Sequence, residues 1–296
     1  MFLKFFENKK NNYIIGAFYF SMSILCGLLN DFIVRYMSFG EMGLAQIMFL
    51  RFLFSALSML PFMIKNKYST DNYTVHLIRS FLFFVPIVLW NYGVSNGGLI
   101  IATFMELSIP VVLLVMAKIF LGEDLKGRIL STILGIASVC FVMFKQLEFG
   151  VSVYVVLAFA VAVLCFSSLD IINKKLLNKD NDPLYAFLFY SALGTSLFSL
   201  PFAVCTWVSV SYQSIVLCMI QGVSSNLILF FILKAYKKTD VSSLQPIRFI
   251  SLPISALLSA VFFKERMSWY LVLGFMFLVV SIMMNIKNEV IKKNKI

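Results

Sequence analysis

One apolar segment occurs twice in this chain, and this duplication restricts the fold more than any other feature. The first copy is SIPVVLLVMAKIFLGE, residues 108–123, and the second is SLPISALLSAVFFKE, residues 251–265. Each copy has a proline near its start and a glutamate at its end. Other landmarks recur at nearly the same spacing, roughly 140 residues apart, such as SALSMLPF at 55–62 and TSLFSLPF at 195–202. The sequence therefore predicts one structural unit used twice.

The composition indicates the class of protein. Of the 296 residues, 60% are hydrophobic and 13% are charged, and apolar runs of about 20 residues recur along the chain. Such runs are typical of membrane-spanning helices. The five cysteines stand singly in apolar runs without a Cys-x-x-Cys pair, so the sequence indicates neither a metal site nor a disulfide framework.

We expect ten transmembrane helices joined by short connections. Basic residues gather in alternate connections and at both ends of the chain, so the positive-inside rule places both termini in the cytoplasm. The formal net charge of +11 reflects this bias, and we expect the bilayer rather than nucleic acid as the partner. The predicted spans are 13–34, 42–64, 75–94, 99–121, 128–146, 151–172, 183–207, 211–233, 241–263 and 268–286.

The duplication divides these spans into two five-helix repeats. We expect the first repeat in residues 1–146, the second in residues 151–286, and a basic cytoplasmic tail in residues 287–296. Because each repeat has an odd number of spans, the second copy has the opposite orientation in the membrane. Inverted repeats are typical of secondary transporters, whose two halves move about a site near the membrane midplane. The predicted class is an all-α polytopic membrane protein that transports a small molecule.

Charged residues inside the spans are the candidates for this site, because each costs about 2.5–3.5 kcal/mol on insertion scales. Glu106 and Arg248 lie at equivalent positions in the two repeats. A pseudo-twofold axis would place them on facing sides of one cavity, where they can bind a zwitterion. A plain ion pair is the structural alternative. Arg51 lies near the middle of its span, whereas Arg79 lies close enough to the inner surface to reach the headgroups.

Two pairs with i,i+4 spacing lie at span ends, namely Asp31 with Arg35 and Asp170 with Lys174. We interpret them as interfacial ion pairs or gating contacts. Glu265 lies where one helix ends and the next begins, so we expect it to anchor a helix start rather than to contact substrate.

Trp90 and Tyr92 lie toward the outer end of the third predicted span. They belong either to an aromatic belt at the membrane interface or to a platform on which a flat ring stacks. The sequence has no GxxxxGK[ST] phosphate loop and no cluster of metal ligands or Ser/His/Asp set. We therefore expect no ATP-driven step, no catalytic centre and no cofactor.

Several longer motifs carry a family resemblance. They are LRFLFSALSMLPF (50–62), LIRSFLFF (77–84), WNYG (90–93), SIPVVLLVMAKIFLGE (108–123), LDIINKKL (169–176), FLFYSAL (187–193), LILFFILKAY (227–236) and PIRF (246–249). With these motifs the chain resembles the drug/metabolite transporter superfamily, EamA type, and within it the S-adenosylmethionine uptake transporters of rickettsia-like bacteria. The family motif positions are matched at Arg51, Arg79, Trp90, Tyr92, Asp170, Asn173, Lys174 and Arg248.

The resemblance implies import of S-adenosylmethionine across a bacterial inner membrane, alone or in exchange for S-adenosylhomocysteine. Two alternatives remain open. One is an exporter or exchanger of amino acids, drugs or other metabolites, in which Glu106 carries the coupling proton. The other is a membrane-embedded subunit that does not transport by itself.

Overall fold

A computed structural model describes residues 2–66, 73–121, 129–148, 150–179, 183–238, 244–265 and 268–293. These ranges are helical apart from short connections, and they contain no β-strand. The elements are α1 (Phe2–Met37), α2 (Leu44–Lys65), α3 (Tyr73–Gly97), α4 (Leu99–Glu106), α5 (Ile109–Leu121), α6 (Ile129–Glu148), α7 (Val153–Lys179), α8 (Leu184–Cys205), α9 (Tyr212–Lys238), η1 (Gln245–Ile250), α11 (Ser251–Leu258), η2 (Ser259–Phe263) and α12 (Trp269–Lys293).

Many of these helices are long and apolar enough to cross a membrane. Six described segments meet that criterion: Ile14–Met37, Leu44–Lys65, Tyr73–Gly97, Val153–Asn173, Leu184–Cys205 and Tyr212–Lys238. Four shorter apolar segments, Leu99–Leu113, Ile133–Lys145, Ser251–Phe263 and Trp269–Ser281, fall in the other predicted spans. The first and last helices extend beyond the predicted spans, because α1 begins at Phe2 and α12 continues to Lys293, through most of the predicted tail.

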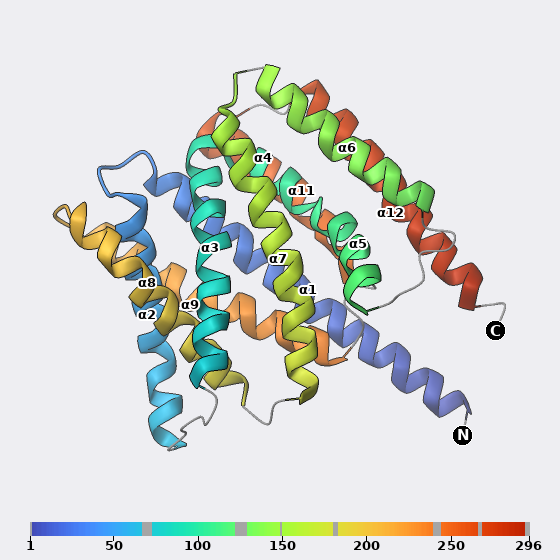
Figure 1. Ribbon diagram of the computed structural model, residues 1–296, viewed down its shortest axis with the longest axis horizontal. Coiled ribbons are helices and arrows are strands. Elements are labelled where there is room, and N and C mark those ends of the chain that lie inside the picture. Colours follow the sequence, from blue (N-terminus) through green and yellow to red (C-terminus); the bar gives the residue numbers. More distant parts are fainter. Residues whose placement is uncertain are drawn as a thin grey trace.

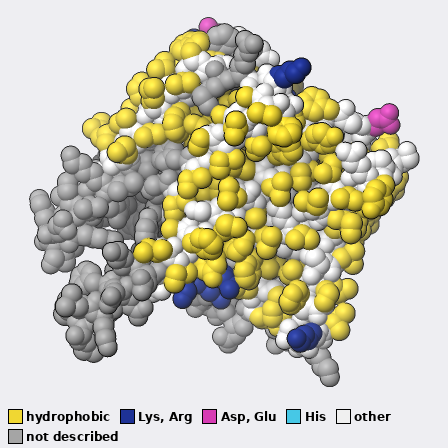
Figure 2. Space-filling view, turned by 180° about the vertical axis from the view of Figure 1, so that it is seen from behind, with side chains coloured by type: hydrophobic (Ala, Val, Ile, Leu, Met, Phe, Trp, Pro, Cys, Tyr) yellow, Lys and Arg dark blue, Asp and Glu magenta, His cyan; other side chains and the backbone are white. Residues whose placement is uncertain are grey.

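Large apolar side chains cover the outside of the bundle. Leu57, Phe81 and Leu197 are about half exposed, and Figure 2 shows a broad hydrophobic face with the basic and acidic side chains near its rim. A soluble monomer rarely exposes so large an apolar surface. This face is suited to contact with lipid.

Packing joins helices that are far apart in the sequence. α1 packs along α9 and α3 along α7, while α2 packs along α8 and α6 along α12. Figure 1 shows α6 and α12 side by side at one edge of the bundle, away from α2 and α8. Glycine permits one close approach, since a Cβ on Gly222 of α9 would lie 2.7 Å from the carbonyl oxygen of Arg51 in α2. Each of these pairs joins a helix of the first half to a helix of the second.

Two predicted spans are interrupted, and both interruptions involve the duplicated segment. The span expected at 99–121 consists of α4 and α5. In the span expected at 241–263, the described residues from 245 on form η1, α11 and η2 in succession. Proline contributes to both breaks. Pro110 and Pro253 have no amide N–H, so neither can donate the helical hydrogen bond to the carbonyl four residues earlier.

Serine hydroxyls satisfy neighbouring carbonyl groups at these breaks. Ser108 Oγ donates to the carbonyl oxygen of Met105 at 2.6 Å, and Ser251 Oγ donates to that of Arg248 at 2.6 Å. The two serines occupy equivalent positions in the Ser-x-Pro sequences of the two copies. The same Ser-x-Pro sequence therefore makes the same serine hydrogen bond twice, next to Glu106 in one copy and at Arg248 in the other.

Candidate functional site

A cavity at the centre of the bundle is lined by residues of α1, α2, α3, α4, α5, α7, α9 and η1. The charged side chains that line it are Asp31, Arg51, Glu106, Asp170 and Arg248. Three of them are acidic and two are basic, so the described lining has one excess negative charge. The cavity volume is about 180 Å³, below the range of about 300–1,000 Å³ that is usual for ligand pockets. Helices must therefore move apart before a ligand of nucleoside size can enter.

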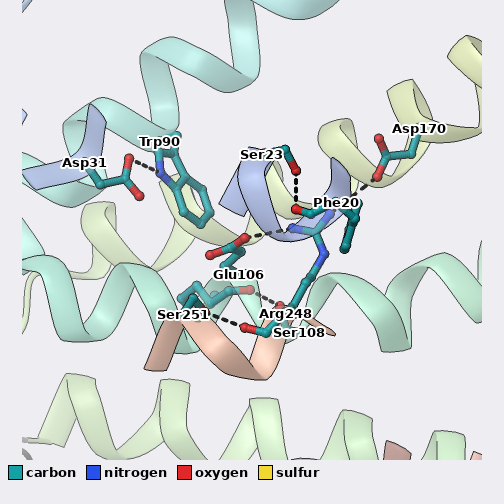
Figure 3. A network of polar contacts seen from close by, with 10 residues as sticks. Phe20, Ser23, Asp31, Trp90, Glu106, Ser108, Asp170, Arg248 and Ser251 are labelled. Carbon is teal, nitrogen blue, oxygen red and sulfur yellow. Dashed lines mark hydrogen bonds and ion pairs between the residues drawn. The ribbon is translucent and has the colours of Figure 1, made fainter. Parts of the chain in front are cut away.

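Arg248 contacts two carboxylates from the other elements. Its Nη1 donates to Glu106 Oε1 at 2.8 Å, and its Nη2 lies 3.8 Å from Asp170 Oδ2. The guanidinium also lies over the ring of Phe20, 5.2 Å from the ring centre. Figure 3 shows Arg248 between the two carboxylates. We call Arg248, Glu106 and Asp170 the Arg248 cluster. Glu106 and Arg248, which occupy equivalent positions in the two repeats, form an ion pair in this structure.

Trp90 is buried beside the same cavity. Its Nε1 donates to Asp31 Oδ1 at 3.1 Å, and its ring makes edge contacts with Phe159 and Phe166 at centroid distances of 5.2 and 5.8 Å. Only 8% of Trp90 is exposed, which is incompatible with a place in an interfacial belt. Tyr92 packs against the hydrophobic core and does not line the cavity.

Arg79 is also buried rather than extended toward headgroups. Its Nη2 donates to Asn173 Oδ1 at 3.1 Å, and its guanidinium stacks over Phe187 at 4.3 Å. Asn173 lines the cavity, so its amide connects Arg79 to the cavity lining. The side chain of Lys174 lies outside the described residues, so the expected pair of Asp170 with Lys174 stays a prediction. Among the described residues, Asp170 Oδ2 lies 3.8 Å from Arg248 Nη2.

Arg35 and Asp31 do not form the expected i,i+4 pair. Arg35 Nε donates to Glu265 Oε1 at 2.9 Å, and its Nη1 donates to the carbonyl oxygen of Ser95 at 2.5 Å. Glu265 Oε2 accepts a hydrogen bond from the backbone N–H of Leu99, at the start of α4, at 3.2 Å. The expectation that Glu265 anchors a helix start is confirmed. We call the group of Arg35, Ser95, Leu99 and Glu265 the Glu265 clamp. It joins the end of α1 to α3, to α4 and to the segment after η2.

A polar network between α1, α2 and α9 was missed by the sequence analysis. Asn30 Nδ2 donates to Ser224 Oγ at 2.9 Å, and Ser55 Oγ donates to Asn226 Oδ1 at 2.8 Å. The available signal was the polar run QGVSSN at 221–226 within an otherwise apolar span. Polar groups in such a span need partners because lipid offers none.

Comparisons with known proteins agree with this architecture. The EamA-like transporter family matches residues 14–144 and 153–287. Proteins described as "S-adenosylmethionine uptake transporter" from Rickettsia conorii and Rickettsia bellii are each 33% identical over 258 residues, which is 86% of this chain and 86% and 87% of theirs. The protein of the same description from Rickettsia prowazekii is 32% identical over 260 residues, 86% of each chain.

One solved structure, described only as "Crystal structure of protein", has a similar fold. It superposes with a TM-score of 0.66 at 16% sequence identity and covers 93% of this chain and 96% of its own. At that identity the likeness concerns the fold alone. The family match covers nearly all of the described helices, and the relatives align over most of both chains. The chain therefore belongs to the EamA-like transporter family and is a multi-pass membrane transporter, not an enzyme.

Proposed function

We propose that this protein imports S-adenosylmethionine across a bacterial inner membrane by alternating access, with the central cavity as its substrate site. The observation that carries the proposal is the similarity to rickettsial proteins described as S-adenosylmethionine uptake transporters, which extends over 86% of the chain. The charge of the cavity supports it. S-adenosylmethionine carries a carboxylate, an ammonium and a sulfonium group, so its net charge is +1, opposite in sign to the excess charge of the described lining.

We also propose that residues 1–146 and 151–286 are inverted repeats, with both termini in the cytoplasm. Helix pairing supports this arrangement. If the halves are exchanged, α1 takes the place of α7 and α3 that of α9, so the α1–α9 pair becomes the α7–α3 pair. The α2–α8 and α6–α12 pairs are unchanged by the exchange. Discontinuous helices at a central site are typical of inverted-repeat transporters, and α4–α5 and η1–α11 are such helices.

The membrane potential is sufficient to drive this uptake. One positive charge that enters across 100 mV, inside negative, gains about 2.3 kcal/mol. Because about 1.4 kcal/mol corresponds to a tenfold ratio, the accumulation reaches roughly fifty-fold. Uniport can therefore work without a coupled ion, and exchange for S-adenosylhomocysteine would add the free energy of the outward gradient of that product.

Uptake of labelled S-adenosylmethionine into bacterial cells that express the full chain tests the proposal. We expect saturable uptake that S-adenosylhomocysteine competes away and that decreases when the membrane potential is collapsed. The control is Lys145→Ala, which removes a basic residue that contacts Glu148 and the ring of Trp269, outside the cavity. Inserted protein that gives no uptake above cells without it contradicts the import proposal, and efflux from preloaded cells then tests the export alternative.

A further inference from the structure

We propose that Asp31 and Arg51 bind the α-amino acid end of the substrate, whereas Arg248 mainly holds the interrupted helices together. This inference rests on the proposed function, because it assigns the groups that recognise that substrate. It differs from the sequence-based expectation, in which Arg248 and Glu106 bind the zwitterion. The charged groups of the cavity differ in the hydrogen-bonding capacity that their contacts leave.

The Arg248 cluster already satisfies its own charges. The two terminal nitrogens of Arg248 each face a different carboxylate, at 2.8 Å for Glu106 and 3.8 Å for Asp170. A substrate carboxylate would have to displace at least one of these side chains and leave it without its cation. Removing one partner from a buried ion pair is costly because the remaining charge is uncompensated. Arg248 is therefore poorly suited to bind an anion in this arrangement.

Arg51 has capacity that Arg248 lacks. Its Nε donates to Ser225 Oγ at 2.7 Å, and its guanidinium lies over the ring of Phe52, 5.0 Å from the centre. These contacts hold the side chain in place from α9 and from its own helix. Arg51 lines the cavity, and its hydrogen bond to a described residue is made by Nε and not by the two terminal nitrogens. A positioned guanidinium with both terminal nitrogens available is the geometry that binds a carboxylate through two parallel hydrogen bonds.

Asp31 supplies the complementary negative charge. Its Oδ1 accepts the hydrogen bond from Trp90, and its Oδ2 has no hydrogen-bond partner among the described residues. Asp31 and Arg51 line the same cavity and carry opposite charges. An ammonium group can therefore bind beside Asp31 while the attached carboxylate binds Arg51. Figure 3 shows the Asp31 carboxylate bound to Trp90, with no contact drawn between it and Arg248.

The repeat offers a matched comparison between two carboxylates. Asp31 and Asp170 occupy equivalent positions in the two halves, and both line the cavity. Asp170 faces Arg248, whereas Asp31 forms no ion pair with a described residue. Asp31→Asn and Asp170→Asn therefore make the same chemical change at equivalent positions. Only the first removes a carboxylate that is available to an ammonium group.

The test uses the purified full-length protein and binding of labelled S-adenosylmethionine, competed by two analogues. One analogue lacks the carboxylate and the other lacks the amino group. Because a hydrogen bond to a charged group contributes about 1.5–3 kcal/mol, the wild type should prefer S-adenosylmethionine over each analogue by roughly 10- to 100-fold. In Arg51→Gln the preference over the analogue without a carboxylate should disappear. In Asp31→Asn the preference over the analogue without an amino group should disappear, and Asp170→Asn should retain it.

Each outcome has one meaning. If Arg51→Gln or Asp31→Asn folds and keeps the wild-type preference, the assignment is overturned while the proposed function stands. If wild-type protein in its folded state binds none of the three compounds, the proposed function fails and the assignment fails with it. If Arg51→Gln does not fold, Arg51→Lys decides, because a lysine keeps the charge but cannot make the two parallel hydrogen bonds. Its preference should fall below about tenfold, and an unchanged preference overturns the assignment.

Discussion

Alanine at Gly98 should destabilise the protein more than alanine at Gly150, although both glycines have positive φ. Gly98 has φ 92° and ψ 168°, a region that is essentially restricted to glycine, so the strain costs about 1–3 kcal/mol. Gly150 has φ 86° and open space around it. Its substitution therefore measures the cost of the backbone conformation alone, and it is the matched control.

The additional loss at Gly98 comes from the Glu265 clamp. A Cβ at Gly98 would lie 2.6 Å from Glu265 Oε1, so the carboxylate has to move away from Arg35 and Leu99. Each of these charge-assisted hydrogen bonds contributes about 1.5–3 kcal/mol. The 18% exposure of the Arg35 and Glu265 side chains favours the lower end of that range. We expect Gly98→Ala to lower the free energy of unfolding by about 4–6 kcal/mol, against about 1–3 kcal/mol for Gly150→Ala.

Unfolding of the purified protein with increasing SDS in mixed micelles measures these free energies. A third variant, Glu265→Ala, and its combination with Gly98→Ala complete the cycle. Because the clash requires the glutamate, the double variant should lose less than the sum of the two single losses. Equal losses for Gly98→Ala and Gly150→Ala, or strict additivity in the cycle, would refute the role assigned to the clamp.

Two further predictions concern packing and charge. Arg248→Gln should lower the free energy of unfolding by about 3–5 kcal/mol, because it leaves Glu106 and Asp170 without their cation. The triple variant that also contains Glu106→Gln and Asp170→Asn should recover most of this loss in the same unfolding assay. No recovery would argue against uncompensated charge as the cause. Gly93→Ala should lower the free energy of unfolding by about 1–3 kcal/mol, because the new Cβ would lie 2.6 Å from the Phe159 ring and push α3 away from α7. Addition of Phe159→Leu should restore part of the thermal stability. An equal loss with Phe159 and with Leu at this position would exclude the contact as the cause.

Sequence periodicity predicted the helices and the duplicated unit because both depend on local composition and on the offset between matching motifs. The offset also predicted that Glu106 and Arg248 lie at one cavity, and in the structure they form the ion pair that was the alternative to facing sides, at 2.8 Å. Spacing was less informative for Asp31 and Arg35. Four residues on a helix place two side chains on one face, but partners on other helices compete for them. Trp90 binds Asp31 and Glu265 binds Arg35, and the local sequence does not indicate either contact.

The helix interruptions could have been predicted in part. A Ser-x-Pro sequence occurs at the start of both duplicated segments, and a proline removes one helical donor. Whether a transmembrane helix bends or breaks at a proline depends on neighbours that satisfy the released carbonyl, and those neighbours are tertiary. The availability of Arg51 was unpredictable for the same reason. It depends on which cavity groups the other charges engage.

The order of the Arg248 cluster along the chain has a consequence for biosynthesis. Glu106 precedes Arg248 by 142 residues, and Asp170 also precedes it, so both carboxylates leave the ribosome before their cation does. Each resides in the membrane at a cost of about 2.5–3.5 kcal/mol until η1 arrives. We expect the early helices to remain loosely associated during translation and to lock together only when Arg248 inserts. A nascent chain that stalls before this residue lacks the cation that Glu106 and Asp170 contact in the folded protein.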